Sequence, residues 1–142
     1  MVCTLILAGG QNTGAASKAL ESNGFVYKVI GTDASARNNH IEITDYIGKE
    51  KHIVFPKEIA GIPVKALTAD FSCTAPIKSV TITDNIDSYT GLTKCETLEK
   101  IILDDSCTRF TVKDGILYSK DMTVLLCYPS AKKNTEKENK FK

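Results

Sequence analysis

The chain has 142 residues, which suits one domain, and its 42% hydrophobic and 25% charged residues are typical of a soluble globular protein rather than a disordered one. The formal net charge of +1 gives no overall attraction to nucleic acid, and no apolar run approaches the ~20 residues that span a bilayer. The chain holds only two His residues, and its five Cys residues form no Cys-x-x-Cys pair. We therefore expect neither a metal site nor a cofactor.

The first 23 residues differ in composition from the rest. Val2–Ala8 is apolar, and the stretch from Gly9 to Ser17 is small and polar. A short apolar run followed by small residues is typical of a signal peptide, although no Lys or Arg precedes this one. We interpret residues 1–23 as a secretion-signal remnant or an N-terminal extension, two alternatives that the residues do not separate.

The same segment supports an alternative function. Leu5–Gly10 resembles the opening of sugar nucleotidyltransferases, where a strand leads into a Gly-rich turn that binds phosphates. That family continues with a Gly-x-Arg element, whereas this chain has Gln11–Ala15. The alternative is therefore a nucleotide-binding enzyme fragment that uses the N-terminal Gly-rich segment.

From Gly24 the pattern becomes that of β-strands. Residues 25–30 are rich in β-branched and aromatic side chains, and residues 41–44 alternate apolar with polar. A third short run at 53–55 ends at Pro56. These three runs predict a meander or a hairpin cap.

An apolar-x-apolar pattern then repeats, at 53–55, 80–82 and 101–103. The last residues of the three patterns are 27 and 21 positions apart (82 minus 55, and 103 minus 82). Periods of 20–29 residues with one short strand each are typical of leucine-rich repeats. Because one such unit cannot bury its own apolar edge, we expect the units to stack as parallel strands with aligned inward columns.

Cys73 and Cys95 occupy matching positions before the second and third units. We expect these two thiols to be reduced, buried and close together in successive turns, since free Cys commonly packs as a small apolar residue. An odd number of Cys residues cannot pair fully within one chain.

These patterns together resemble the BspA-like leucine-rich repeat family. The segments that carry the likeness are 43–48, 53–64, 71–82 and 110–129. The likeness covers about residues 24–131 and departs at 89–92, where the family usually has an Ala-Phe pair. The resemblance implies a mostly β fold, a short leucine-rich-repeat solenoid of about two to three repeats, capped by β-hairpins at 25–46 and 110–128.

The family comprises surface and secreted proteins associated with adhesion and protein binding rather than catalysis. The resemblance thus implies that residues 24–131 are a non-catalytic binding module of a cell-surface or secreted protein. Its partner would be a host or matrix protein, or a second copy of the chain. Residues 132–142 hold five Lys and two Glu and are predicted to be a disordered tail.

Strand alternation predicts the binding face. If residues such as Ile53 and Phe55 point inward, the residues between them point outward. The predicted exposed residues are Val54, Thr81 and Ile102 in the middle, flanked by Ser79, Thr83, Lys100 and Asp104, with His52 at the first repeat. Exposed apolar residues in line can mark a contact site, and a scattered, ordinary surface is the open alternative.

Two further sets of residues have a chemical interpretation. His40 and His52 each open a strand and would approach each other if those strands were neighbours, but no third ligand has suitable spacing. The pairs Asp84/Asp87 and Asp104/Asp105 resemble paired carboxylates of glycosidases, yet Asp after a short strand is ordinary turn chemistry. We interpret the His residues as polar strand-edge residues and the Asp residues as turn residues.

Overall fold

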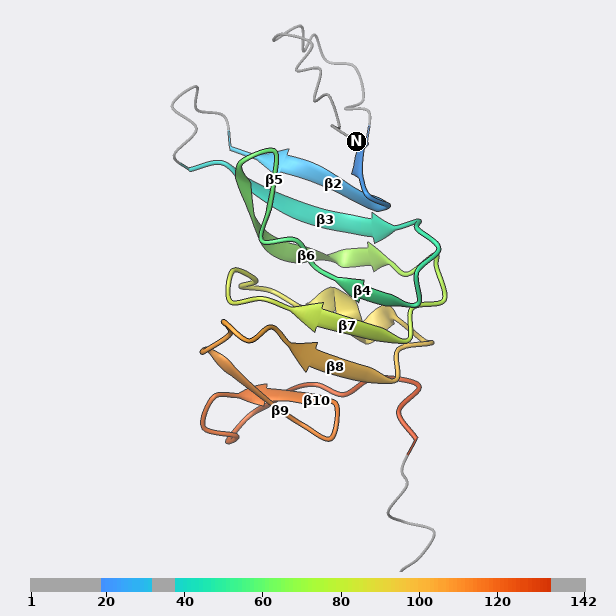
Figure 1. Cartoon of the computed structure of the whole chain (residues 1–142), viewed down its shortest axis with the longest axis vertical. Helices are drawn as coiled ribbons and strands as arrows, with labels where there is room; N and C mark the ends of the chain where they lie inside the picture. Colours follow the sequence, from blue (N-terminus) through green and yellow to red (C-terminus); the bar gives the residue numbers. More distant parts are fainter. Residues whose placement is uncertain (1–18, 32–37, 134–142) are drawn as a thin grey trace, which may run out of the picture.

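A computed structural model describes residues 19–31 and 38–133, and these form a mostly β fold, as predicted. The elements are β1 (Leu20–Ser22), β2 (Phe25–Ile30), β3 (His40–Tyr46), β4 (His52–Val54), β5 (Glu58–Ile59), β6 (Ile62–Ser72), β7 (Ser79–Ile82), the 3-10 helix η1 (Thr90–Lys94), β8 (Lys100–Leu103), β9 (Phe110–Lys113), β10 (Ile116–Ser119) and β11 (Leu125–Cys127). They form three sheets of order β1-β2-β3-β6-β5, β4-β7-β8 and β11-β10-β9. The strands succeed one another along the long axis of the molecule (Figure 1).

The first sheet contains the predicted hairpin at 25–46. Strands β2 and β3 pair antiparallel, with Tyr27 opposite Ile43. The 11-residue strand β6, which the sequence did not predict, joins β3 in parallel, with Ile41 opposite Val64. The expectation that 53–55 is the third strand of a meander is wrong, because β4 pairs with β7 in the second sheet.

The second sheet confirms the predicted parallel strands. Ile53 lies opposite Val80, and Val80 lies opposite Ile101, so the three repeats are in register. All three side chains are buried and form one inward column. Phe55 and Ile82 are also fully buried, so two columns of apolar side chains fill the space behind this sheet.

Backbone hydrogen bonds also stack the turns that lead into these strands. The N–H of Lys78 donates to the carbonyl of Lys51 at 2.6 Å, and the N–H of Glu99 donates to the carbonyl of Lys78 at 2.8 Å. The hydroxyl of Thr97 donates to the carbonyl of Ile77 at 2.8 Å. Each repeat thus pairs with its neighbour before its strand begins, which fixes the register of the strands.

The cysteines differ in part from the prediction. Cys73 and Cys95 lie close together as expected, with Cα atoms 5.2 Å apart, but they form a disulfide and are not reduced. Cys95 is fully buried and Cys73 only partly. Cys107 and Cys127 are free, and burial raises the pKa of the Cys127 thiol to about 11.

The predicted hairpin at 110–128 is present as the antiparallel strands β9, β10 and β11. Asp114 and Gly115 form its first turn with φ of 52° and 78°, the left-handed conformations of a two-residue hairpin loop. The Gly115 carbonyl accepts a hydrogen bond from the N–H of Ile101 at 2.9 Å, and a Cβ at Gly115 would lie 2.8 Å from the Lys100 Cβ. The hairpin therefore packs closely against the outer edge of β8.

At the N-terminus, residues Leu20–Ser22 of the predicted extension form β1 and pair with β2. Residues 1–18, which carry the signal-remnant and Gly-rich interpretations, lie outside the described residues, as do 134–142 of the predicted tail. In the described ranges, no helix has the length and apolar character to cross a membrane.

Candidate functional site

The candidate site is the outer strand face, which we define as the outward side chains of β4, β7 and β8. Val54, Thr81 and Ile102 lie opposite one another in three parallel strands. Val54 is 59% exposed, Ile102 is 40% exposed and Thr81 between them is half-buried. Adjacent strands lie about 4.8 Å apart, so this row crosses about 10 Å of surface. The row sits where alternation predicts it.

A second row lies at the start of the same strands and contains His52, Ser79 and Lys100. His52 and Lys100 are exposed, but Ser79 is 2% exposed, so the expectation that Ser79 contributes to the surface is wrong. Ser79 belongs to the central strand, where the side chains of both neighbouring strands flank it. Its hydroxyl oxygen lies 2.7 Å from Nδ1 of His52.

The His52–Ser79 contact brings together the two residue types of a hydrolytic dyad. A nucleophile must reach the substrate, and the Ser79 side chain is closed off from solvent. The contact instead joins the first two repeats across the sheet. Nor do the described ranges contain a group of three or more His, Cys, Asp or Glu residues that is able to hold a metal ion.

At the other end of the strands, Thr83 is 1% exposed, so its predicted place on the face is also wrong. Strand β7 ends at Ile82, where alternation stops, and the chain turns, with the N–H of Ile86 donating to the Thr83 carbonyl at 3.3 Å. Asp104 is half-buried and lies 3.3 Å from Nζ of Lys57.

Charged residues just before and after the strands of the outer strand face are partly compensated. Hydrogen bonds from the hydroxyl and the N–H of Ser106, with Lys57 nearby, lower the pKa of Asp104. Lys78 bonds Glu99 at 2.8 Å and lowers the pKa of that carboxyl. Lys100 forms no ion pair with another described residue. The face thus consists of the row of Val54, Thr81 and Ile102 with the Lys100 ammonium group beside it. This arrangement suits the binding of a partner rather than catalysis.

The remaining predicted polar residues have structural contacts. His40 and His52 begin strands of different sheets, so their strands are not neighbours; His40 Nε2 lies 3.7 Å from Glu42 Oε1 instead. Asp104 accepts a hydrogen bond from the N–H of Ser106 at 3.0 Å, which is the turn chemistry expected of it. Asp84 differs from that expectation, because it accepts a hydrogen bond at 2.9 Å from the N–H of Thr108, which is distant in sequence.

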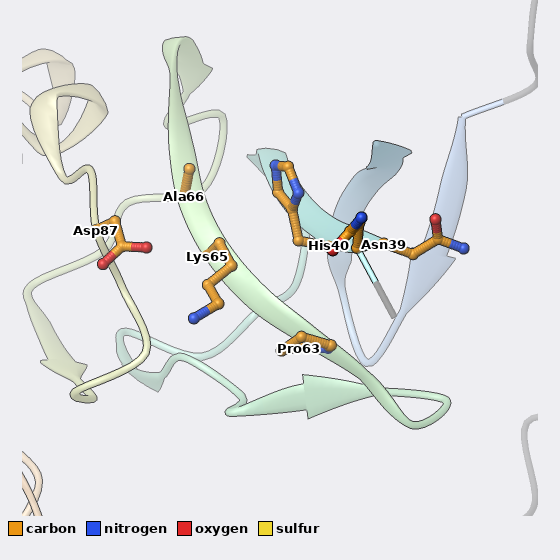
Figure 2. Close-up of a pocket in the computed structure, with 7 residues that line it drawn as sticks. Asn39, His40, Pro63, Lys65, Ala66 and Asp87 are labelled. Carbon is orange, nitrogen blue, oxygen red and sulfur yellow. The ribbon is translucent and has the colours of Figure 1, made fainter. Parts of the chain in front are cut away.

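The structure also contains a pocket of about 390 Å³ that the sequence did not indicate (Figure 2). Its lining includes Asn38, Asn39, His40, Pro63, Lys65 and Asp87. These residues come from three separate segments with no repeat spacing, and one segment is the unpredicted strand β6. Of these residues, only His40 and Asp87 stand out in the sequence, and the sequence predicts neither to lie in this pocket.

Solved structures similar to this chain are leucine-rich repeat proteins, the class that the sequence resembles. A leucine rich cell surface protein from Faecalibacterium prausnitzii A2-165 is 17% identical over 66% of this chain and 25% of its own, with a TM-score of 0.47. A leucine-rich repeat protein from Eubacterium ventriosum is 22% identical over 63% of this chain and 26% of its own, with a TM-score of 0.46. One from Bacteroides capillosus is 13% identical over 63% of this chain and 67% of its own, with a TM-score of 0.47.

The chain spans about a quarter of the length of the first two of these proteins. No family model matches the chain, and no curated protein matches its sequence.

Proposed function

We propose that the chain is a non-catalytic protein-binding module, of the adhesion type, in a cell-surface or secreted protein. In this proposal residues 24–131 are a short leucine-rich-repeat solenoid of two to three repeats between hairpin caps, with residues 1–23 before it and a Lys-rich tail, 132–142, after it. The observation that carries the proposal is the row of Val54, Thr81 and Ile102.

This row has the properties of a contact surface. Two of its three side chains are large, apolar and exposed, and they are held at fixed spacing by a sheet whose inward side chains are buried, apart from the partly buried Leu103. Aligned exposed apolar groups mark interaction sites more often than scattered ones do. Because the sheet already holds these side chains in place, little conformational entropy is lost on this side of the interface when a partner binds.

The disulfide supports the proposed location. Cys73 and Cys95 are bonded, and disulfides form and persist mainly in oxidising compartments outside the cytosol. A surface or secreted module is consistent with that bond.

The partner in this proposal is another protein or a second copy of the chain. The test replaces Val54 and Ile102 with Lys in one double variant. A matched control replaces Val124 and Leu125 with Lys; these residues are 52% and 55% exposed and lie in the hairpin at 110–128, which we call the closing hairpin. Self-association is measured by sedimentation, and a captured extracellular protein is purified and titrated against each form.

We expect the Val54→Lys/Ile102→Lys variant to raise the dissociation constant at least about tenfold, since burying one such side chain contributes roughly 1.5–3 kcal/mol. The control variant should bind like the wild-type chain. Circular dichroism establishes that both variants are folded. Equal binding by all three proteins, or loss of binding only in the control, would contradict the proposal.

A further inference from the structure

The pocket near His40 is built from three segments that are far apart in sequence. His40 lies on β3, Pro63 and Lys65 lie on β6, and Asp87 lies on the loop after β7 (Figure 2). The N–H of Asp87 donates to the carbonyl of Lys65 at 2.6 Å, which fixes these two positions relative to each other. None of these residues belongs to the outer strand face.

Among the charged groups of the pocket, the Lys65 ammonium group has no ion pair with a described residue and can therefore bind a ligand. Asp87 is compensated by Arg109, whose Nη1 lies 2.7 Å from Asp87 Oδ1. Glu42 next to His40 is compensated by Lys28 at 3.0 Å. Lys65 forms no ion pair with any described residue and lies between Asp87 and His40 in Figure 2. The pocket therefore favours a ligand with a single negative charge.

The other lining groups suit hydroxyl groups and a small apolar face. The side-chain amide of Asn38 both donates and accepts hydrogen bonds, and the Asp87 carboxylate is an acceptor for a hydroxyl. Pro63 and Ala66 add apolar surface. A volume of about 390 Å³ is near the lower end of ligand pockets, at roughly 300–1,000 Å³, and suits one ring rather than a chain of rings.

We propose that this pocket binds one acidic monosaccharide unit, a pyranose ring that carries a carboxylate. Lys65 binds the carboxylate, Asp87 and Asn38 bind ring hydroxyls, and Pro63 and Ala66 contact the C–H face of the ring. The unit is either a free sugar or a residue of an acidic polysaccharide.

The test uses saturation-transfer difference NMR on the full chain at pH 7 with D-glucuronate as the probe. Glucose supplies the hydroxyls without the carboxylate, and acetate supplies the carboxylate without the hydroxyls. A hyaluronan oligosaccharide presents glucuronate within a chain, so comparison with free glucuronate distinguishes the two sources. We expect saturation transfer to glucuronate in at least one of these two forms and none to glucose or acetate.

Two variants locate the site. Lys65→Met removes the ammonium group but keeps most of the stem, and should weaken glucuronate binding about tenfold or more, as the loss of a charge-assisted hydrogen bond does. Lys113→Met, at an exposed lysine of β9 that lies in neither the pocket nor the outer strand face, is the matched control and should bind like the wild-type chain. Backbone NMR spectra confirm that both variants fold.

The proposal is overturned if neither form of glucuronate gives saturation transfer, if acetate binds as well as glucuronate, or if Lys65→Met leaves the affinity unchanged. None of these outcomes bears on the protein partner of the outer strand face, which involves different residues.

Discussion

Asp84 connects the second repeat to the loop that follows the third. Its Oδ1 accepts hydrogen bonds from the N–H groups of Thr108 and Arg109 at 2.9 and 3.0 Å, and its Oδ2 accepts one from the Thr108 hydroxyl at 2.9 Å. Desolvation raises the pKa of Asp84, but the hydrogen bonds from Cys107, Thr108 and Arg109 together outweigh it and lower the pKa to about 2.

This carboxylate makes folding stability depend on pH. Because the folded pKa of about 2 lies below the ordinary 3.8, the stabilisation is present above pH 3.8 and is lost as the pH falls through 2. We expect Asp84→Asn to lower the melting temperature at pH 6, with the difference from the wild-type chain shrinking between pH 4 and pH 2. A difference that stays constant over that range in thermal melts would show that the Asp84 charge does not stabilise the fold. Asp121 also has a lowered pKa, but it is present in both the wild-type chain and the Asp84→Asn variant, so it does not contribute to the difference between their melting temperatures.

The sequence predicts the exposure of a single side chain correctly only where the alternation of inward and outward side chains along a strand decides it. Val54 and Ile102 lie on outer strands of the second sheet, and period-two alternation places them outward correctly. Ser79 obeys the same alternation, but it is only 2% exposed and its hydroxyl lies against the His52 ring of the neighbouring strand. Thr83 lies one residue beyond the end of β7, where the period no longer applies.

Among the elements, strand β6 is the one that the local pattern of apolar and polar residues does not predict. Its sequence includes Pro63 and a stretch, Ala66–Phe71, without strand-like alternation. Its parallel pairing with β3 shifts register between Ile41 and Glu42 and again between Ile43 and Asp45, so it follows no simple period. The repeat strands were predictable because three copies of one pattern stand at similar spacing, whereas β6 occurs once.

The disulfide is the covalent link between successive repeats. It joins Cys73 and Cys95, which are 22 residues apart, and the loop entropy removed from the unfolded chain corresponds to about 3 kcal/mol. We expect a Cys73→Ser/Cys95→Ser variant to lose about that free energy of unfolding in urea titrations. Cys107→Ser, at a free and half-buried thiol, is the control and should change stability little, because the serine hydroxyl keeps a hydrogen-bond donor next to Asp84. An unchanged urea midpoint in the double variant would show that the bond does not constrain the unfolded chain.

Across the whole molecule, the second sheet lies between the first sheet and the closing hairpin along the long axis (Figure 1). Hydrogen bonds cross each boundary: the N–H of Leu67, on β6, donates to the carbonyl of Ser88, in the loop after β7, at 2.9 Å, and the N–H of Ile101 donates to the Gly115 carbonyl at 2.9 Å. The outer strand face is thus supported from both ends and is pre-ordered for binding.

The outer strand face is the proposed protein-binding surface, and amide chemical-shift mapping with the purified partner tests this most directly. We predict that the largest shifts fall on His52–Val54, Thr81 and Lys100–Ile102, with the first sheet and residues 110–128 little changed. Shifts concentrated on the closing hairpin or on the first sheet, with the amides of β4, β7 and β8 unmoved, would contradict the account.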